Sequence, residues 1–368
     1  MSTSDRSHER RPDVAAAALL RQAVAARIVP AAVAEVGDST GVLWREACGA
    51  LSFDPGAPAA TERTIFDLAS LTKPIVTTSV VLQLGAARAI GLQDPVSSYF
   101  REWNGLDRES VTVQDLLEHA SGLSARLLDP PPEGRREFEH EICTIPLEYT
   151  PRSRSIYSDL GFILLGFLAE DRGAAPLSVQ FEGFIRGMSR AAGDEDVGWL
   201  AFGVPPRLAA NTAPTLPMDE DPRRGRRLTG QVHDNYAWML GGVAGHAGLF
   251  GTAGAVGAFA RVVLRAARGD GTGSSPLSPA LGGQAIRKST VPGSSRARGW
   301  DTMLPTSSCG TELSPAAFGH VGFTGTSLWI DPVVDRYYVL LTNRVCGGGT
   351  PDELQRVRRA FHDALATR

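Results

Sequence analysis

Strand-like sequence occurs at both ends of this chain, and the long stretch between them has mostly helical patterning. Near the N-terminus, apolar segments at 31–36 and 41–48 are joined by a Gly-Asp-Ser-Thr turn and predict a β-hairpin. Near the C-terminus, apolar and β-branched residues at 319–330 and 336–342 flank a second turn and predict another hairpin. Because strands must share a sheet to bury their apolar faces, we expect one antiparallel sheet built from both chain ends, with a helical domain inserted.

Helical patterns supply the layers around this sheet. An amphipathic stretch at 12–28 and a final one at 351–366 predict helices that flank it. The predicted fold class is therefore α/β (α+β). Its α/β domain comprises residues 12–66 and 285–368, and residues 67–284 form a helical domain with active-site loops. Inside that helical domain, helices are predicted at 70–88, 112–119, 158–170 and 254–268.

Composition and charge remove several classes of protein. Charged residues make up 21% of the 368 residues and the formal net charge is −3, which predicts no basic surface for nucleic acid. No apolar run has the length of a membrane-spanning helix. Arg21 and Arg27 interrupt the one N-terminal stretch that could form a signal peptide. We therefore expect a cytoplasmic protein that acts on a small molecule and contacts neither membrane nor nucleic acid.

Metal and cofactor signatures are missing from the sequence. The four cysteines lie far apart without a CxxC pair, so we expect reduced thiols rather than a zinc site or a disulfide scaffold. No HExxH, P-loop or dinucleotide fingerprint occurs. The G-x-S-x-G elbow of α/β-hydrolase esterases does not occur either. The expectation is an activity without metal or cofactor.

The Ser-Leu-Thr-Lys segment from Ser70 to Lys73 is the first candidate for chemistry, because Pro74 limits it to a helix start. Proline is tolerated within the first helical turn, so Lys73 lies one turn beyond Ser70 on the same face. The helix N-terminus favours an oxyanion beside Ser70, and the Lys73 amine can take the hydroxyl proton when its surroundings lower its pKa. Only Lys73 and Lys288 are lysines among 37 basic residues, and arginine cannot act as a base. Helix capping by Ser70 is the structural alternative.

A second candidate segment is Tyr157-Ser158-Asp159, which precedes a strongly apolar stretch. Ser158 or Asp159 can cap the helix predicted there. In a site, Tyr157 would instead share a proton with Lys73. Asp159 would then hydrogen-bond to Lys73 or to a substrate amide.

The third candidate is the stretch 319–325, which reads Gly-His-Val-Gly-Phe-Thr-Gly. Its glycines suit a strand that another backbone approaches closely. A substrate carbonyl along this strand would receive the N–H of Phe323 and, with the N–H of Ser70, complete an oxyanion hole. A glycine-rich edge strand with a packed His320 is the structural alternative.

The order and spacing of these three segments resemble the motifs of the serine β-lactamase and penicillin-binding-protein superfamily, S-x-x-K, then Y-x-N or S-x-N, then K-T-G. The details are most similar to the class C β-lactamase branch, which also contains D-aminopeptidases, D,D-carboxypeptidases, esterases and some acyltransferases. Further blocks extend the resemblance over nearly the whole chain, at 94–96, 113–123, 238–252 and 299–301.

The resemblance implies roles for individual residues. Ser70 would form the acyl-enzyme, Lys73 would be the general base for acylation, and Tyr157 would activate Ser70 or the deacylating water. Gly322 and Phe323 would carry the strand that holds the substrate.

Two residues depart from the family pattern. Asp159 replaces the usual Asn and places a negative charge beside Lys73, which would make the amine a poorer base unless Asp159 is protonated or turned away. His320 replaces the usual Lys, which in β-lactamases is a permanent cation for the substrate carboxylate. Both changes argue against an efficient β-lactamase and favour the esterase and peptidase members.

Three functions remain open from the sequence. The first is hydrolysis of an ester or small amide through an acyl-serine. The second is transfer of the same acyl group to an amine or alcohol. The third is a non-catalytic binding module, although such modules often lose the serine or the lysine, and Ser70 and Lys73 are both present.

Overall fold

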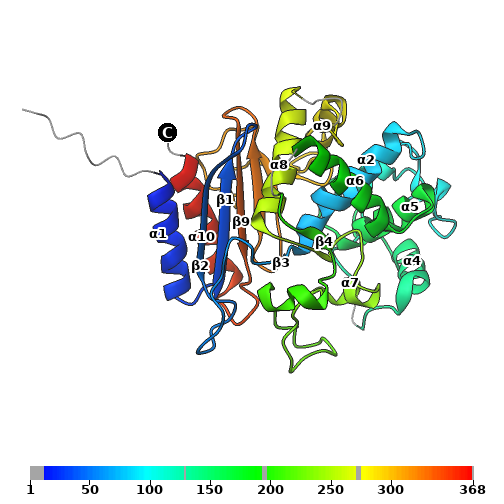
Figure 1. Ribbon diagram of the computed structural model, residues 1–368. Coiled ribbons are helices and arrows are strands. Elements are labelled where there is room, and N and C mark those ends of the chain that lie inside the picture. Colours follow the sequence, from blue (N-terminus) through cyan, green and yellow to red (C-terminus); the bar gives the residue numbers. More distant parts are fainter. Residues whose placement is uncertain (1–11, 128–129, 193–196, 271–274, 367–368) are drawn as a thin grey trace, which may run out of the picture.

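Strands from both chain ends form one antiparallel sheet, as the sequence predicts. The computed structural model describes residues 12–127, 130–192, 197–270 and 275–366 (Figure 1). Within them the sheet has the order β2-β1-β9-β8-β7-β6, and β1 pairs with β9 so that Val33 faces Leu341. The strands are β1 (Ala31–Gly37), β2 (Val42–Gly49), β6 (Asp301–Thr302), β7 (Phe318–Val321), β8 (Ser327–Asp331) and β9 (Arg336–Thr342).

Helices cover both faces of this sheet. The terminal helices α1 (Pro12–Ala25) and α10 (Pro351–Ala366) pack side by side on the outer face, where they bury a common apolar cluster with β1 (Figure 1). The opposite face is covered by α8 (Ala253–Arg268), which contacts β1, β8 and β9. Since α8 comes from the segment 67–284, part of that segment packs directly on the sheet. The division into two domains remains a prediction.

The remaining elements form the helical part on the other side of α8 (Figure 1). A separate small sheet has the order β3-β5-β4 and consists of β3 (Phe66–Asp67), β4 (Leu200–Phe202) and β5 (Leu249–Gly251). The short helical turns are η1 (Ala69–Leu71), η2 (Lys73–Thr78), η3 (Val96–Ser98) and η4 (Pro206–Asn211). The α-helices are α2 (Ser79–Ala86), α3 (Val113–Leu117), α4 (Gly134–Thr144), α5 (Asp159–Gly173), α6 (Leu177–Ala192), α7 (Asn235–Met239) and α9 (Pro279–Ala285).

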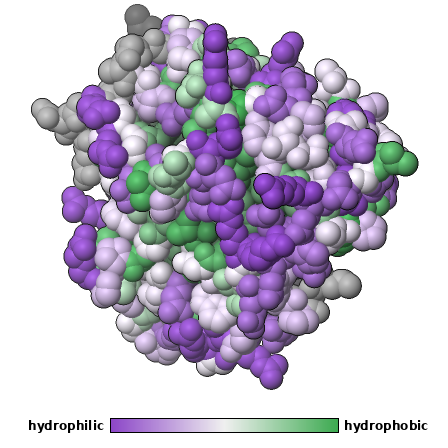
Figure 2. Space-filling view, turned by 90° about the vertical axis from the view of Figure 1, so that its right-hand side faces the viewer, coloured by the Kyte–Doolittle hydropathy of each residue, from purple (hydrophilic) through white to green (hydrophobic). Residues whose placement is uncertain are grey.

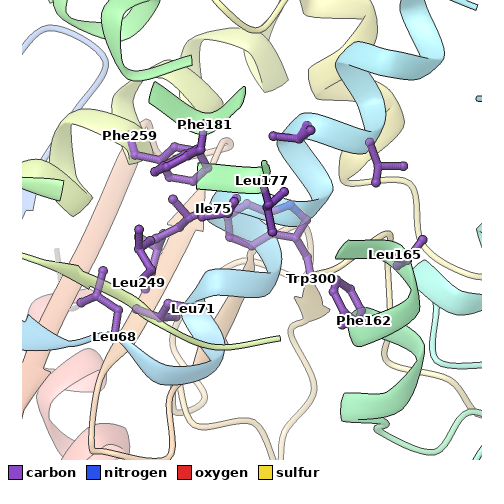
Figure 3. Close-up of a cluster of buried hydrophobic side chains, with 14 of the residues drawn as sticks. Leu68, Leu71, Ile75, Phe162, Leu165, Leu177, Phe181, Leu249, Phe259 and Trp300 are labelled. Atoms are coloured by element: carbon purple, nitrogen blue, oxygen red, sulfur yellow. The ribbon is translucent and has the colours of Figure 1, made fainter. Parts of the chain in front are cut away.

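The largest apolar cluster holds the segment that carries Ser70. Figure 3 shows Leu71 and Ile75 of this segment among Leu249, Phe259 and Trp300, which come from β5, α8 and the stretch before β6. All five side chains are almost fully buried. Truncating a buried leucine or isoleucine of this kind costs about 2–5 kcal/mol of stability. The backbone under the candidate nucleophile is therefore fixed by packing.

Two elements differ from the sequence predictions. The helix predicted at 70–88 is divided into η1, the π-type turn η2 and α2. Pro74 lies in the first turn of η2 and has no N–H to donate, which explains an irregular start. The strand predicted at 319–330 is also interrupted, because residues 322–326 form a tight turn between β7 and β8. The sequence patterns had not indicated α4, α6, α7 or α9.

Within the described ranges, no helix combines the length and apolarity needed to cross a membrane. On the face shown in Figure 2, hydrophobic side chains form small patches between hydrophilic ones. That face offers no broad apolar area.

Candidate active site

Ser70 lies at a strained turn between β3 and η2. Ala69, just before it, has a φ of 48°, a conformation that residues with a side chain seldom adopt. Two hydrogen bonds hold this conformation: the Ala69 N–H donates to Asp67 Oδ1 at 2.8 Å, and Thr72 Oγ1 donates to the Ala69 carbonyl at 2.6 Å. Backbone strain retained in this way concentrates at functional sites.

Lys73 is fully buried and reaches three acceptors. Its Nζ donates to Ser70 Oγ at 3.1 Å, to Asp159 Oδ1 at 2.7 Å and to the His246 carbonyl at 3.2 Å. Burial alone lowers the pKa of Lys73, but the charge and hydrogen bond of Asp159 foremost outweigh it and the pKa is raised. Three acceptors around one amine match the three donors of an ammonium group. In the resting site, Lys73 is therefore a cation.

Asp159 belongs to a chain of opposite charges. Its second oxygen, Oδ2, accepts from Arg126 Nη1 at 2.8 Å. The same nitrogen donates to Asp234 Oδ2 at 3.0 Å, and Asp234 Oδ1 lies 2.8 Å from His246 Nε2. Burial raises the pKa of Asp159, yet the nearby cations, Lys73 foremost, lower it overall. Asp159 is thus neither protonated nor turned away, which settles the question that its replacement of Asn raised.

Arg126 is held in place by more than these two carboxylates. Its Nη2 donates to Asn235 Oδ1 at 2.7 Å, and its guanidinium lies 3.9 Å from the ring centroid of Tyr236. Both partners come from α7, whose N-cap is Asp234. One short helix therefore holds Arg126, the second cation beside Asp159, in place.

Tyr157 lies between the two halves of the site. Its ring centroid is 4.7 Å from Lys73 Nζ, 4.7 Å from the ring of His119 and 5.9 Å from the ring of His320. Burial raises the pKa of Tyr157, and Lys73 only partly offsets this. Tyr157 therefore carries its proton at rest. The next residue, Ser158, caps α5, as one of the two sequence alternatives predicted.

His320 on β7 offers a lone pair rather than a charge. Its Nδ1 lies 2.8 Å from the Val321 carbonyl, which can only accept, so Nδ1 carries the hydrogen. Its Nε2 is buried and has no partner among the described residues. Burial, followed by the charges of Lys73 and Arg296, lowers the pKa of His320 to about 3. The position that holds a lysine in the family motif is neutral in this chain.

Gly322 and Phe323 lie in the turn after β7, not on the strand where the sequence placed them. A Cβ atom on Gly322 would come within 2.1 Å of Thr326 Oγ1 and 2.6 Å of the Leu68 carbonyl. Thr326 Oγ1 donates to that carbonyl at 3.0 Å, and Thr324 Oγ1 donates to the Asp67 carbonyl at 2.8 Å. The turn is therefore fastened to the backbone just before Ser70.

These residues surround one cavity of about 470 Å³. Six of the seven predicted site residues line it, and Lys73 lies behind Ser70. They are Ser70, Tyr157, Asp159, His320, Gly322 and Phe323.

Sequence reasoning missed several cavity residues. Arg126 and Asp234 belong to no sequence motif. Arg126 bonds to Asp159, 33 positions further along the chain, and to Asp234, 108 positions further along, so no local pattern could reveal them. His246 does not line the cavity; its place in the block at 238–252 favours a structural role, and its carbonyl and ring contact Lys73 and Asp234. Arg344 also lines the cavity, and no sequence motif marks its position after β9.

The described residues contain no group of three or more His, Cys, Asp or Glu side chains placed to hold a metal ion. All four cysteines are free thiols. Burial raises the pKa of Cys143 and Cys309 to about 12, so these thiols are unreactive.

The family model described as Beta-lactamase matches residues 16–362. A Salmonella gallinarum protein carrying the name "Putative D-alanyl-D-alanine carboxypeptidase" is 33% identical over 313 residues, which is 77% of this chain and 70% of that protein. The same name belongs to a Salmonella agona protein that is 32% identical over the same shares.

Solved structures with the same architecture have different activities in their descriptions. EstCE1, a hydrolase with promiscuous acyltransferase activity, has a TM-score of 0.74 at 19% identity and covers 96% of this chain and 97% of its own. Simvastatin synthase LovD from Aspergillus terreus has a TM-score of 0.73 at 17% identity and covers 97% of this chain and 98% of its own. A class C β-lactamase from Rhodobacter sphaeroides has a TM-score of 0.73 at 18% identity and covers 95% of this chain and 98% of its own. At these identities the likeness establishes the fold.

Proposed function

This chain belongs to the Beta-lactamase family as a serine hydrolase, and we propose that it cleaves an ester or small amide through an acyl-enzyme on Ser70. The observation that carries the proposal is the 3.1 Å hydrogen bond between Lys73 Nζ and Ser70 Oγ at a strained turn that opens into the cavity. A nucleophile within hydrogen-bond distance of a titratable amine is the arrangement that acyl transfer requires.

In the proposed acylation step, Ser70 Oγ attacks the substrate carbonyl carbon. Its proton passes to Lys73 Nζ in the fraction of enzyme whose amine is neutral. The backbone N–H groups of Ser70 and Phe323 receive the oxyanion, because the turn fastened at Gly322 brings the two segments together. The leaving group takes its proton through Tyr157 and departs, and water then releases the acyl group by the same path.

The ion pair between Lys73 and Asp159 sets a requirement for this step. Because Asp159 raises the pKa of Lys73, the neutral amine is a small fraction of the enzyme near neutral pH. We therefore expect kcat/KM to rise towards alkaline pH. Activated esters, which need less help from a base than β-lactams or peptides, fit such a site best.

His320 supports the same choice of substrate. A neutral imidazole with a free Nε2 accepts a hydrogen bond and cannot replace the lysine ammonium that holds the carboxylate of a β-lactam. We therefore propose an esterase or amidase activity ahead of antibiotic hydrolysis.

Acyl transfer is the second candidate. The cavity of about 470 Å³ and the 56% exposed Phe323 beside it leave room for an organic acceptor next to the acyl-serine. EstCE1 and LovD, which share the fold, are described as an acyltransferase-active hydrolase and a synthase.

The test uses a fluorophosphonate probe and p-nitrophenyl acetate with the wild type and Ser70→Ala. We expect wild-type labelling on Ser70, located by mass spectrometry, and neither labelling nor esterase activity in Ser70→Ala. Equal labelling of the two proteins would contradict the proposal and favour a non-catalytic binding module. Partition of the acetyl group between water and added alcohols or amines then separates the hydrolase from the acyltransferase.

A further inference from the structure

The wall of the cavity that follows β9 contains positive charge with no carboxylate to balance it. Four arginines and three aspartates line the cavity, and Lys73 lies directly behind it. Arg126 is neutralised by Asp159 and Asp234, and Arg296 lies 3.5 Å from Asp301. The remaining two are Arg344 and Arg358.

Neither of these two arginines contacts a carboxylate among the described residues. Arg344 donates from Nη1 to the Gly349 carbonyl and from Nη2 to the Phe323 carbonyl, both at 3.2 Å. Arg358 Nη2 donates to the carbonyls of Gly322 and Thr326 at 2.9 and 2.8 Å. The Nε atoms of both are buried without a partner. Guanidinium groups removed from water are ordinarily paired with an anion, so this wall is suited to bind one.

The two arginines differ in what they can reach. Arg358 is 7% exposed and is committed to the turn carbonyls, so it acts as a fixed charge behind the turn. Arg344 is half-buried, and its two carbonyl contacts use two of its five N–H donors. Its guanidinium also lies 5.5 Å from the ring centroid of Phe323. Because Arg344 is the less buried of the two and still has unused N–H donors, it is the group that a ligand can reach.

Resting on the proposed function, we infer that Arg344 binds a carboxylate of the substrate at the end of the cavity beside Phe323, with Arg358 reinforcing the positive potential. The substrate is then an ester or amide that carries a carboxylate next to an apolar group. The link to Ser70 is short in structural terms, since Phe323 follows Gly322 and Gly322 abuts the Leu68 carbonyl. A substrate that spans from Ser70 past Phe323 reaches Arg344.

This assignment also accounts for the neutral His320. The family motif places a cation on the strand, whereas here the strand carries a neutral imidazole and the cation stands on the loop after β9. A planar guanidinium pairs with a carboxylate in a bidentate manner, which a histidine or lysine cannot reproduce. Substrates of this protein would therefore hold their carboxylate further from the reacting carbonyl than β-lactams do.

The first experiment compares paired substrates in which a carboxylate is replaced by its neutral methyl ester at the same position of the ring. The pairs are 4-acetoxybenzoate with its methyl ester, which place the charge on the leaving group, and monomethyl with dimethyl terephthalate, which place it on the acyl side. We expect at least one pair to show about tenfold or greater preference for the anion in kcat/KM, expressed mainly in KM. Arg344→Ala should remove this preference, and Arg344→Lys should retain part of it.

The matched control is Arg186→Ala, since Arg186 is 64% exposed on α6 and its ion pair with Glu182 spans 3.8 Å. It should leave the preference unchanged. An equal preference in the wild type and Arg344→Ala, or a wild-type preference for the neutral ester in both pairs, would overturn the inference. Thermal unfolding of both Arg344 variants checks that they remain folded.

A binding measurement separates this inference from the proposed function. Titration calorimetry with 4-hydroxybenzoate is performed on Ser70→Ala, which cannot form an acyl-enzyme. We expect about tenfold weaker binding when Arg344→Ala is added. If carboxylate binding depends on Arg344 while no ester is cleaved by the wild type, the function fails and the anion site stands. Binding that is indifferent to Arg344, or inorganic phosphate that binds more tightly than 4-hydroxybenzoate, would contradict the carboxylate assignment.

Discussion

The two walls of the cavity differ in whether their charged groups are paired. On the helical wall, Lys73, Asp159, Arg126 and Asp234 form an alternating chain in which every charge touches its opposite. On the sheet wall, His320 is neutral with a free lone pair, and Arg344 has no carboxylate partner among the described residues. Paired charges hold each other rigid, whereas unpaired groups remain available to a ligand. We infer that the helical wall prepares the nucleophile and the sheet wall selects the substrate.

The largest effect should come from the helical wall, by replacing its amine. Lys73→Arg keeps the positive charge but cannot accept the proton of Ser70, so kcat/KM should fall at least about a thousandfold. Steady-state hydrolysis of p-nitrophenyl acetate measures this. Lys288→Arg is the matched control, because Lys288 is the other lysine of the chain and is exposed. Activity within a few-fold of wild type in Lys73→Arg would refute the assigned base.

The next effect tests whether the paired charges tune that amine. Asp159→Asn removes the anion at 2.7 Å, which lowers the pKa of Lys73 and should raise kcat/KM at pH 7 about tenfold. Arg126→Ala leaves Asp159 to act on Lys73 alone and should shift the acid limb of the pH profile upwards. Profiles of kcat/KM from pH 6 to 10 show both. If the acid limbs of the two variants shifted in the same direction, or did not shift, the proposed coupling would be contradicted.

A smaller effect should follow from altering the lone pair on the sheet wall. His320→Ala removes a cavity-lining imidazole whose buried acceptor nitrogen has no partner among the described residues, and we expect kcat/KM to fall about tenfold. His320→Gln supplies an amide oxygen near the same place and should retain more activity. Neither variant should move the acid limb of the pH profile, since the pKa of His320 is lowered to about 3. Wild-type kinetics in His320→Ala would make the residue purely structural.

The smallest effect concerns the stability of the fold at acid pH and involves His362 on α10, which does not line the cavity. Burial lowers the pKa of His362 to about 3, whereas the same histidine takes up a proton near pH 6.5 in the unfolded chain. Its contribution to stability is therefore present above pH 6.5 and is lost as the pH falls towards 3, amounting to about 2 kcal/mol by pH 5. His362→Phe should make the loss of stability between pH 6.5 and 4 shallower in urea unfolding. A slope in His362→Phe equal to that of the wild type would contradict this assignment.

Local sequence signals were sufficient for most of the fold. Period-2 and period-3.6 patterns act over a few residues, so they located β1, β2, β9, α1, α8 and α10 close to their final bounds. The short α7 and α9 went undetected because helices of five and seven residues are too brief for a period to emerge. The turn at 322–326 was read as strand because its glycines carry no pattern of their own.

For the site, sequence by itself determined which residue types were available: a serine one turn from one of two lysines, an aspartate in place of an asparagine, and a histidine in place of a lysine. Only the tertiary structure decided their states. Whether Asp159 is charged depends on Arg126, and Arg126 depends on α7, about a hundred residues away. Electrostatic coupling acts through space. No pattern along the chain could therefore show that Lys73 rests in an ion pair, or that Arg344 has no carboxylate partner among the described residues.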